Sequence, residues 1–460
     1  MQRLWSRRNL LKAIGATTAG AVLSDSALAG LINRPMEFPP QPMPPNKPVT
    51  AIVAGAGARG NTYSAYAQKF PSELQIVGFA EPIPFRSDRF ARKYNIPRER
   101  RFKTWEDIFK VPKFADTVII TTPDALHYGP AMAALEMGYD LLLEKAIAQS
   151  WKECSDIKNL ALERNRIVAI CHVLRYAPFF RKVKEIVDSG TIGRLVSIQL
   201  IEPVEHIHMS HSFVRGNWRN TKESNPMLLS KSCHDLDLLL WITGKHCERI
   251  GSLGSLTWFK KENAPPGSTK RCTDGCAVEA TCPYSALKIY YRRQSWLGHM
   301  DLPEEGDKGP AILAQLKTGP YGRCVYHSDN DVVDHQVVMM EFEDGITASF
   351  NMEAHTSYAG RRIRVMGTGG DIVGDEQDLL VSDFQTEQTV RWNVNEHADL
   401  SSGHGGGDFG LVRDFVQAVS QQNPKLLLTT IESAMESHLM AFKAEEARAN
   451  GTLKRVRDVD

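Results

Sequence analysis

A glycine-rich turn near the N-terminal end of the chain has the spacing of a phosphate-binding loop. It follows a short apolar run, Thr50–Ala54, and precedes a helical pattern. Glycines at such a turn allow a tight bend and let a pyrophosphate approach the backbone N–H groups that open the helix. The pattern predicts a dinucleotide site whose ligands include Gly55, Gly57, Arg59 and Gly60.

An acidic residue beyond this turn indicates which dinucleotide fits. Glu81 lies 21 residues after Gly60, where the next apolar run ends. A carboxylate at that place accepts the two ribose hydroxyls and repels the 2′-phosphate of NADP. NAD is therefore favoured, while Arg86 nearby leaves NADP open.

Polar residues at the ends of two further apolar runs extend the same predicted site. Parallel strands present ligands at their carboxyl ends, so we expect these residues to line the cofactor. For the two threonines, capping of the next helix is the alternative. The residues are Thr121, Thr122, Pro123, His127, Glu144 and Lys145.

The order of apolar patterns predicts two domains of different character. Over residues 49–175, short apolar runs alternate with helical periods, which is typical of a Rossmann domain with parallel strands. Residues 176–460 have longer alternating patterns, and Asp344-Gly345 between two of them signals an antiparallel hairpin. We expect an α/β protein: a Rossmann domain followed by an α+β domain with a large, open, mainly antiparallel sheet.

Taken together, these motifs resemble the Gfo/Idh/MocA family, which includes glucose-fructose oxidoreductase and inositol dehydrogenase. Further markers of the resemblance are Arg175-Tyr176-Ala177-Pro178 and His234 with Asp237, and it covers nearly the whole chain after residue 48. It implies an NAD(P)-dependent oxidoreductase that acts on a carbohydrate hydroxyl, assembled as a homodimer or homotetramer whose second domain binds substrate and mediates oligomerisation.

The resemblance also assigns the two catalytic roles. Lys145 would hydrogen-bond the substrate hydroxyl beside the nicotinamide, and His234 would take up its proton. The alternatives are a surface ion pair between Glu144 and Lys145 and a purely structural His234. The family usually has proline where this chain has Ala146.

Many members also carry an aspartate at the position of Ser230, one helical turn before His234. Its absence suggests that another polar residue contacts the catalytic pair. The candidates are Lys231, Asp235 and Asp237.

A dense polar and aromatic stretch over residues 206–219 is suited to hydrogen bonds with sugar hydroxyls and to ring stacking. Its three histidines could also hold a metal. A glycine-rich stretch that begins at His404 resembles a family loop over the substrate. The predicted substrate ligands are Arg175, His211, Trp218, Lys231, Asp237 and His404.

Half of the eight cysteines are grouped in the second predicted domain. Four thiolates could hold structural zinc or an iron–sulfur cluster, but the spacing is not that of a standard zinc knuckle, so disulfides are equally compatible. The grouped residues are Cys272, Cys276, Cys282 and Cys324.

The first residues have the character of an export signal. Arg7-Arg8 within Ser6–Lys12 is similar to the twin-arginine motif, and Ala27-Leu28-Ala29 resembles a cleavage site. These features predict a signal peptide over residues 1–29. They also predict the twin-arginine (Tat) translocase as a partner and a periplasmic or otherwise exported protein.

Seven prolines within residues 35–48 predict an extended arm over residues 30–48, which is either a spacer or a strap on another subunit. The formal net charge of +1 makes nucleic acid an unexpected partner, and no later stretch is apolar enough to span a membrane.

Export would constrain the chemistry, because no nicotinamide pool outside the cytoplasm re-oxidises the cofactor. The dinucleotide would therefore be retained and returned to its starting redox state in each cycle. One hypothesis is a two-substrate oxidoreductase, in which oxidation of one sugar is followed by reduction of another carbonyl. The alternative is an NAD-dependent glycosidase, in which transient oxidation of a ring hydroxyl allows elimination of the aglycone, addition of water and return of the hydride. A non-enzymatic carbohydrate sensor is a third option.

Overall fold

Two sheets form the framework of the protein. The computed structural model describes residues 27–33, 45–398, 400 and 402–458. Within these residues, the first sheet has six parallel strands in the order β3-β2-β1-β4-β5-β6. They are β1 (Val49–Ala54), β2 (Leu74–Ala80), β3 (Arg101–Phe102), β4 (Thr117–Ile120), β5 (Asp140–Leu143) and β6 (Val168–Ile170).

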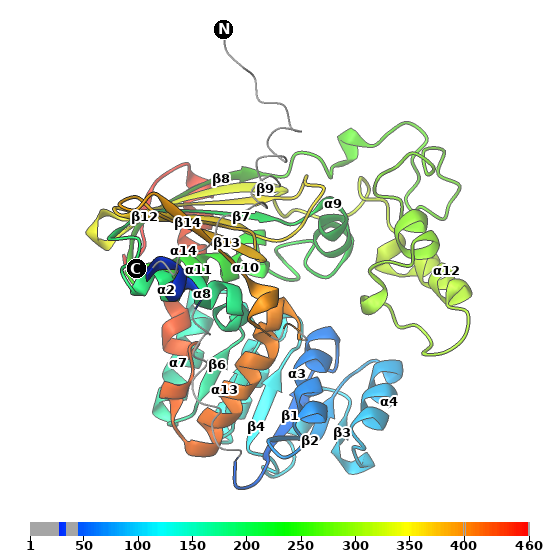
Figure 1. Cartoon of the computed structure of the whole chain (residues 1–460). Coiled ribbons are helices and arrows are strands. Elements are labelled where there is room, and N and C mark those ends of the chain that lie inside the picture. Colours follow the sequence, from blue (N-terminus) through cyan, green and yellow to red (C-terminus); the bar gives the residue numbers. More distant parts are fainter. Residues whose placement is uncertain (1–26, 34–44, 399, 401, 459–460) are drawn as a thin grey trace.

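Helices cover both faces of this parallel sheet (Figure 1). All four residues of β4 and of β5 are buried, as expected for strands with both faces covered. Capping residues in the sequence mark where some of these helices start. α7, for example, has a capping box of Ser150 and Glu153. The helices of this part are α3 (Ala58–Lys69), α4 (Pro84–Lys93), α5 (Trp105–Ile108), α6 (Tyr128–Glu136) and α7 (Trp151–Glu163).

The second sheet is larger and open. Its nine described strands have the order β14-β13-β12-β11-β7-β10-β9-β8-β15, and all neighbours are antiparallel except β7 and β10. The strands are β7 (Leu195–Pro203), β8 (Cys247–Ser255), β9 (His335–Phe342), β10 (Thr347–Glu353), β11 (Arg362–Gly367), β12 (Gly370–Gly374), β13 (Asp378–Asp383), β14 (Gln388–Asn393) and β15 (Lys454–Arg455). The predicted fold class is confirmed.

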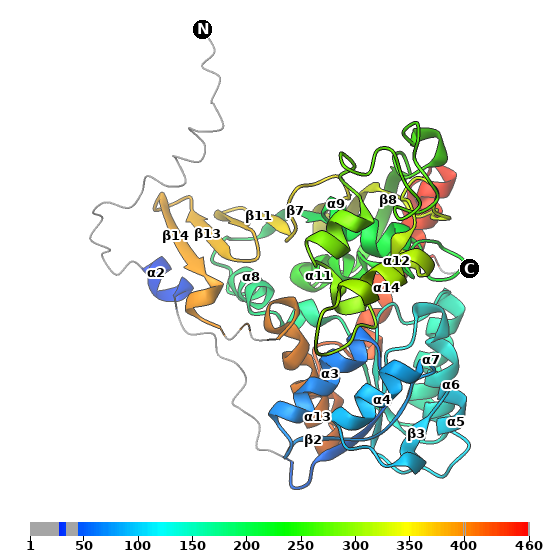
Figure 2. The ribbon, with the colours of Figure 1, turned by 90° about the vertical axis from the view of Figure 1, so that its right-hand side faces the viewer.

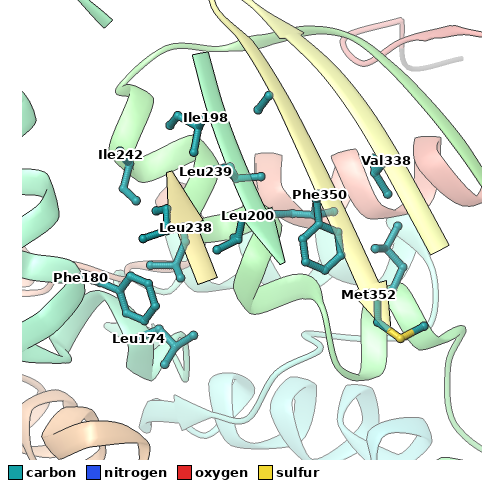
Figure 3. Packing of buried hydrophobic residues seen from close by; sticks show 14 of the residues in the cluster. Leu174, Phe180, Ile198, Leu200, Leu238, Leu239, Ile242, Val338, Phe350 and Met352 are labelled. Carbon is teal, nitrogen blue, oxygen red and sulfur yellow. The ribbon is translucent and has the colours of Figure 1, made fainter. Parts of the chain in front are cut away.

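One face of the second sheet packs on helices that lie between the two sheets. Leu238 and Leu239 of α11 lie against Ile198 and Leu200 of β7, with Phe350 of β10 beside them, all at the centre of one buried cluster (Figure 3). The helices of this region are α8 (Pro178–Asp188), α9 (His206–His208), α10 (Met227–Ser230), α11 (Cys233–Thr243) and α14 (Ile431–Asn450).

The predicted hairpin is confirmed in position. β9 and β10 pair antiparallel around the turn, and Asp344 and Gly345 have φ values of 62° and 73°. Positive φ at both central residues is what a tight hairpin turn of this hand requires. Four strands were not predicted: β3 and β15 are only two residues long, and β8 and β13 lack a strong alternation of apolar side chains.

The chain returns from the second sheet to the first. α13 (Gly407–Gln421), in the part assigned to the second domain, packs against α3 and β1 and buries Leu411, Val412 and Phe415 with the Rossmann core. The helices that cover the first sheet therefore come from both parts of the chain.

A long segment between β8 and β9, residues 256–334, lies beside the first domain (Figure 2). We call it the 256–334 segment. It includes α12 (Gly309–Thr318) and has its own small core, which contains Ile289, Tyr290 and Ile312.

The predicted export signal and arm fall mostly outside the described residues. Of this part, the structure describes a short helix, α2 (Ala27–Ile32), whose Leu28 and Ile32 are buried against the core of the second sheet, and the residues from Pro45 onward. None of the described helices combines the length and hydropathy of a transmembrane segment.

Candidate active site

The glycine turn forms a cradle at the carboxyl end of β1. Gly55 has φ +98°, and a Cβ there would lie 2.7 Å from the carbonyl oxygen of Thr121. A Cβ on Gly60 would lie 2.2 Å from the carbonyl oxygen of Gly55, whereas a Cβ on Gly57 would meet nothing within 4 Å. Open space thus lies beside the start of α3, where no side chain caps the helix. Its first N–H groups suit a pyrophosphate, so the residues present fit a dinucleotide.

Two more strand ends meet the cradle at the same edge of the sheet. Glu81, directly after β2, accepts a hydrogen bond from the N–H of Ile83 at 3.0 Å. Glu81 is buried, and burial raises the pKa of its carboxyl group. After β4, the hydroxyl of Thr121 donates to the carbonyl oxygen of Gly55 at 2.6 Å, and Thr122 and Pro123 follow at this edge.

Arg59 and Glu144, both predicted as cofactor ligands, bind each other. Arg59 Nε lies 2.6 Å from Glu144 Oε1, and its Nη2 lies 2.7 Å from Asp408 Oδ1 at the start of α13. Tyr63 also donates to Glu144 Oε1, at 2.7 Å. Burial opposes ionisation of Glu144, but the charges of Arg59 and Lys145 hold its pKa below the usual value. This network fixes the end of β5 against the glycine turn.

Lys145 follows β5 and points away from this network toward the second domain. Its Nζ donates to the backbone carbonyl oxygen of Ser230 and lies 6.0 Å from the ring centre of Trp218. The Lys145–Ala146 peptide bond is cis. The ammonium group thus lies between the two domains, at the edge where the dinucleotide cradle ends.

His234, in the first turn of α11, lies near this ammonium group. The side chain is buried, and its Nδ1 has no hydrogen-bond partner among the described residues. Burial lowers the pKa of His234 well below the ordinary value, and the nearby charge of Lys145 lowers it further. The imidazole is therefore neutral near pH 7 and able to accept a proton.

At the position of Ser230, where many family members have an aspartate, a backbone carbonyl group takes the place of the carboxylate. The carbonyl oxygen of Ser230 contacts Lys145, so a neutral dipole stands where many members have a carboxylate. The three residues considered as substitutes have other partners. Lys231 Nζ lies 3.3 Å from Glu202 Oε1, and Asp235 Oδ1 lies 2.6 Å from Arg361 Nε.

The third substitute, Asp237, belongs to a buried ion pair. Arg175 donates to both carboxylate oxygens of Asp237, at 2.7 and 2.6 Å, and to the carbonyl oxygen of Leu428 at 2.9 Å. Both side chains were predicted as substrate ligands. Their polar atoms instead bind each other, because the bidentate pair compensates for their burial.

Trp218 forms a wall beside Lys145. Its indole N–H donates to Asp124 Oδ1 at 3.0 Å, and Ser224 donates to the other oxygen of that carboxylate at 3.1 Å. Asp124 lies in the loop after β4, so a residue of the first domain orients an aromatic ring of the second. Asp124 was not predicted as a site residue, although it directly follows Thr122-Pro123.

Asp124→Ala is expected to weaken substrate binding more than it slows the reaction. The lost acceptor leaves Trp218 without its anchor, and a hydrogen bond to a charged group is worth ~1.5–3 kcal/mol, so KM should rise roughly tenfold or more with little change in kcat. Steady-state kinetics would measure this, with Asp156→Ala on the exposed face of α7 as the control. An unchanged KM would contradict the role given to Trp218.

Two buried histidines hold the loop around Lys145. His127 lies with Nδ1 2.6 Å from the carbonyl oxygen of Ala146 and Nε2 2.9 Å from that of Thr122, so it links the two loops rather than facing open space. His438 of α14 accepts the N–H of Ile147 on Nε2 at 3.0 Å. His438 was not predicted, since 291 residues separate it from its partner.

The two remaining predicted substrate ligands, His404 and His211, lie in different parts of the structure. His404 is partly exposed, its Nδ1 lies 3.1 Å from Asp408 Oδ1, and its ring centre lies 5.9 Å from that of His234. His211 is buried under the 256–334 segment, where its Nδ1 lies 2.8 Å from the hydroxyl oxygen of Tyr290 and its ring stacks on Tyr321. His404 thus borders the catalytic pair, and His211 helps to seat the segment.

Comparison with protein families agrees with this geometry. Residues 49–172 match the model described as "Oxidoreductase family, NAD-binding Rossmann fold", and residues 184–456 match "Oxidoreductase family, C-terminal alpha/beta domain". The chain belongs to the Gfo/Idh/MocA family. It is thus an oxidoreductase with an NAD-binding domain.

Individual relatives of this Gfo/Idh/MocA protein are distant. The chain is 25% identical to the protein YteT of Bacillus subtilis (strain 168), over 75% of this chain and 83% of that protein. It is 25% identical to 2,7-anhydro-N-acetylneuraminate hydratase of Mediterraneibacter gnavus, over 30% of this chain and 36% of the relative. A solved structure of levoglucosan dehydrogenase in complex with NADH superposes with a TM-score of 0.66 at 18% identity, covering 90% of this chain and all of that one.

The predicted metal or disulfide site of this Gfo/Idh/MocA chain is not formed. The four grouped cysteines line one small pocket, but all are free thiols, and within the described residues no three His, Cys, Asp or Glu side chains gather closely enough to hold a metal. Arg215, which is fully buried, lines the same pocket. Its charge disfavours a second cation there. Within the part of the chain that the structure describes, the histidines of residues 206–211 likewise do not gather into a group that could hold a metal.

Proposed function

We propose that this protein is an NAD-dependent oxidoreductase that removes hydride from a hydroxyl-bearing ring carbon of a sugar or sugar derivative and keeps its cofactor bound. The observation that carries the proposal is the meeting of Lys145 and His234 between the domains, beside the open cradle at Gly57. A cationic donor and a neutral base side by side are what alcohol oxidation requires.

The chain's own residues divide the work as follows. NAD, when bound, supplies the acceptor for hydride. The ammonium group of Lys145 donates a hydrogen bond to the hydroxyl oxygen and stabilises the negative charge that develops there. His234 accepts the hydroxyl proton as the O–H bond breaks, while the electrons of the C–H bond leave as hydride and the C=O bond forms. Trp218 offers an apolar face to the ring, and His404 closes the site near His234.

The cellular setting belongs to the same proposal. The twin-arginine motif at Arg7-Arg8 supports export through the Tat translocase and a periplasmic location. An exported enzyme has no nicotinamide pool, so a retained dinucleotide would regain its starting redox state by reducing a second carbonyl substrate. Exposed apolar side chains on the second sheet support assembly as a homodimer or homotetramer, among them Leu253, Met339 and Val373.

A second candidate is a glycosidase that uses transient oxidation. The relative from Mediterraneibacter gnavus is named a hydratase, so a protein similar to part of this chain is named for adding water rather than for net oxidation. In this chain, Lys145 and His234 would assist transient oxidation of the ring carbon by bound NAD, a neighbouring proton would then be removed, the aglycone would be eliminated, water would add and the hydride would return. Atoms and electrons balance with water as the only co-reactant.

Product analysis separates the two candidates. Purified protein would be incubated with a panel of free sugars and aryl glycosides, alone and with a carbonyl acceptor, and the products identified by mass spectrometry. The oxidoreductase gives a keto sugar or lactone and a reduced acceptor in equal amounts. A released aglycone with no oxidised sugar would overturn this in favour of the glycosidase, and Lys145→Met serves as the inactive control.

A further inference from the structure

Arg86 lies close to the predicted ribose-binding site, where a positive charge would favour the 2′-phosphate of NADP. Arg86 lies in the first turn of α4, five residues after Glu81, and the two side chains influence each other electrostatically. A carboxylate at this place selects against NADP, and a nearby arginine selects for it. From the sequence alone the two residues oppose each other.

The structure gives Arg86 a partner from the other domain. Its Nε lies 2.7 Å from Oδ1 of Asp301, in the 256–334 segment, and about a third of each side chain is exposed. A second ion pair, 3.0 Å between Arg89 Nε and Glu304 Oε1, joins the same helix to the same loop. In Figure 2 this segment lies over the side of the first domain that carries α4.

This loop also lies near the carboxylate that is predicted to bind the ribose. Glu81 is only 6% exposed, and Asp301 and Arg86 both act on its charge. Tyr321 of the same segment acts on Arg86. The rim of the ribose site thus carries two carboxylates and one guanidinium, and the guanidinium is already hydrogen-bonded.

We propose that Asp301 is a specificity-determining residue that selects NAD over NADP by occupying Arg86. A 2′-phosphate carries nearly two negative charges and needs a free cation, yet here it would meet Glu81 and Asp301 with the guanidinium engaged. The carboxylate of Asp301 turns an arginine that would recruit NADP into a neutral pair. This assignment rests on the proposed binding of a dinucleotide at the glycine turn.

The test compares which dinucleotide each variant retains. Wild-type protein, Asp301→Asn, Asp301→Asn with Arg86→Gln, and Glu304→Gln would each be equilibrated with equal concentrations of NAD and NADP. After removal of free ligand, the bound dinucleotides would be released by denaturation and quantified by mass spectrometry. Glu304→Gln is the matched control. It breaks the other ion pair between this loop and α4, the one that Glu304 forms with Arg89.

We expect Asp301→Asn to raise the NADP:NAD ratio about tenfold, which corresponds to ~1.4 kcal/mol. Adding Arg86→Gln should return the ratio toward the wild-type value, and Glu304→Gln should leave it within about twofold. An unchanged ratio in Asp301→Asn, or an equal rise in Glu304→Gln, would overturn the assignment while leaving NAD binding intact. A wild-type protein that retains neither dinucleotide would overturn the proposed function and this assignment together.

Discussion

Lys145→Met should lower turnover roughly a hundredfold to a thousandfold while leaving the bound dinucleotide in place. Methionine keeps much of the length of lysine but removes the ammonium group that donates to Ser230 and faces the reacting hydroxyl. The developing alkoxide then loses its principal electrostatic partner. Because Glu144 stays bound by Arg59 and Tyr63, the cradle itself should keep its shape.

The measurement pairs kcat with dinucleotide content, and Lys152→Met provides the control. Lys152 lies on the exposed face of α7, and 82% of its side chain is exposed. Its replacement should change turnover less than twofold. Wild-type activity in Lys145→Met would remove the central catalytic assignment, and a loss of activity that accompanies loss of the dinucleotide would make Lys145 a binding residue only.

His234→Gln is expected to reduce turnover by roughly 10²–10⁴-fold, the usual contribution of a positioned general base. Glutamine keeps polar atoms near the position of the imidazole but cannot accept the proton. The pH dependence of the wild-type enzyme carries a second expectation. Since burial and Lys145 hold the pKa of His234 well below the ordinary value, the base stays unprotonated as the pH falls through ~6.5, where a solvent-exposed imidazole would gain a proton.

The profile of kcat/KM should therefore stay flat as the pH falls from about 7.5 to about 5.5. An acidic limb centred near ~6.5 that disappears in His234→Gln would contradict the neutral, buried state of the base. His246→Gln is the control, because His246 is half-exposed at the start of β8 and pairs with Glu436. That variant should keep both the rate and the shape of the profile.

The patterns that could be predicted are those encoded over short stretches of chain. Apolar runs of four to seven residues located β1, β2, β4 and β5, and the glycine spacing located the cradle, because neighbouring residues alone determine these features. Asp344-Gly345 fixed the hairpin for the same reason. β3 was not predicted, because a strand of two residues is too short to show an alternation of apolar and polar side chains.

The site partners that escaped prediction are set by contacts between distant residues. Arg175 and Asp237 are 62 positions apart, and Arg59 and Asp408 are 349 apart, so nothing in either neighbourhood shows that each satisfies the other. The contact that replaces the missing family aspartate is a backbone carbonyl, that of Ser230, which any residue type could supply. Spacing among cysteines likewise did not reveal that Arg215 shares their pocket.

The central claim is that a dinucleotide stays in the cradle at Gly57 while a sugar hydroxyl reacts between Lys145 and His234. The most direct measurement is the near-ultraviolet spectrum of the purified protein, without added cofactor, before and after addition of a substrate found by the product screen. We expect that oxidised nicotinamide is released on denaturation and that one equivalent becomes reduced on addition of the sugar when no acceptor is present. Protein that turns over the sugar with no nicotinamide bound and none taken up would contradict it.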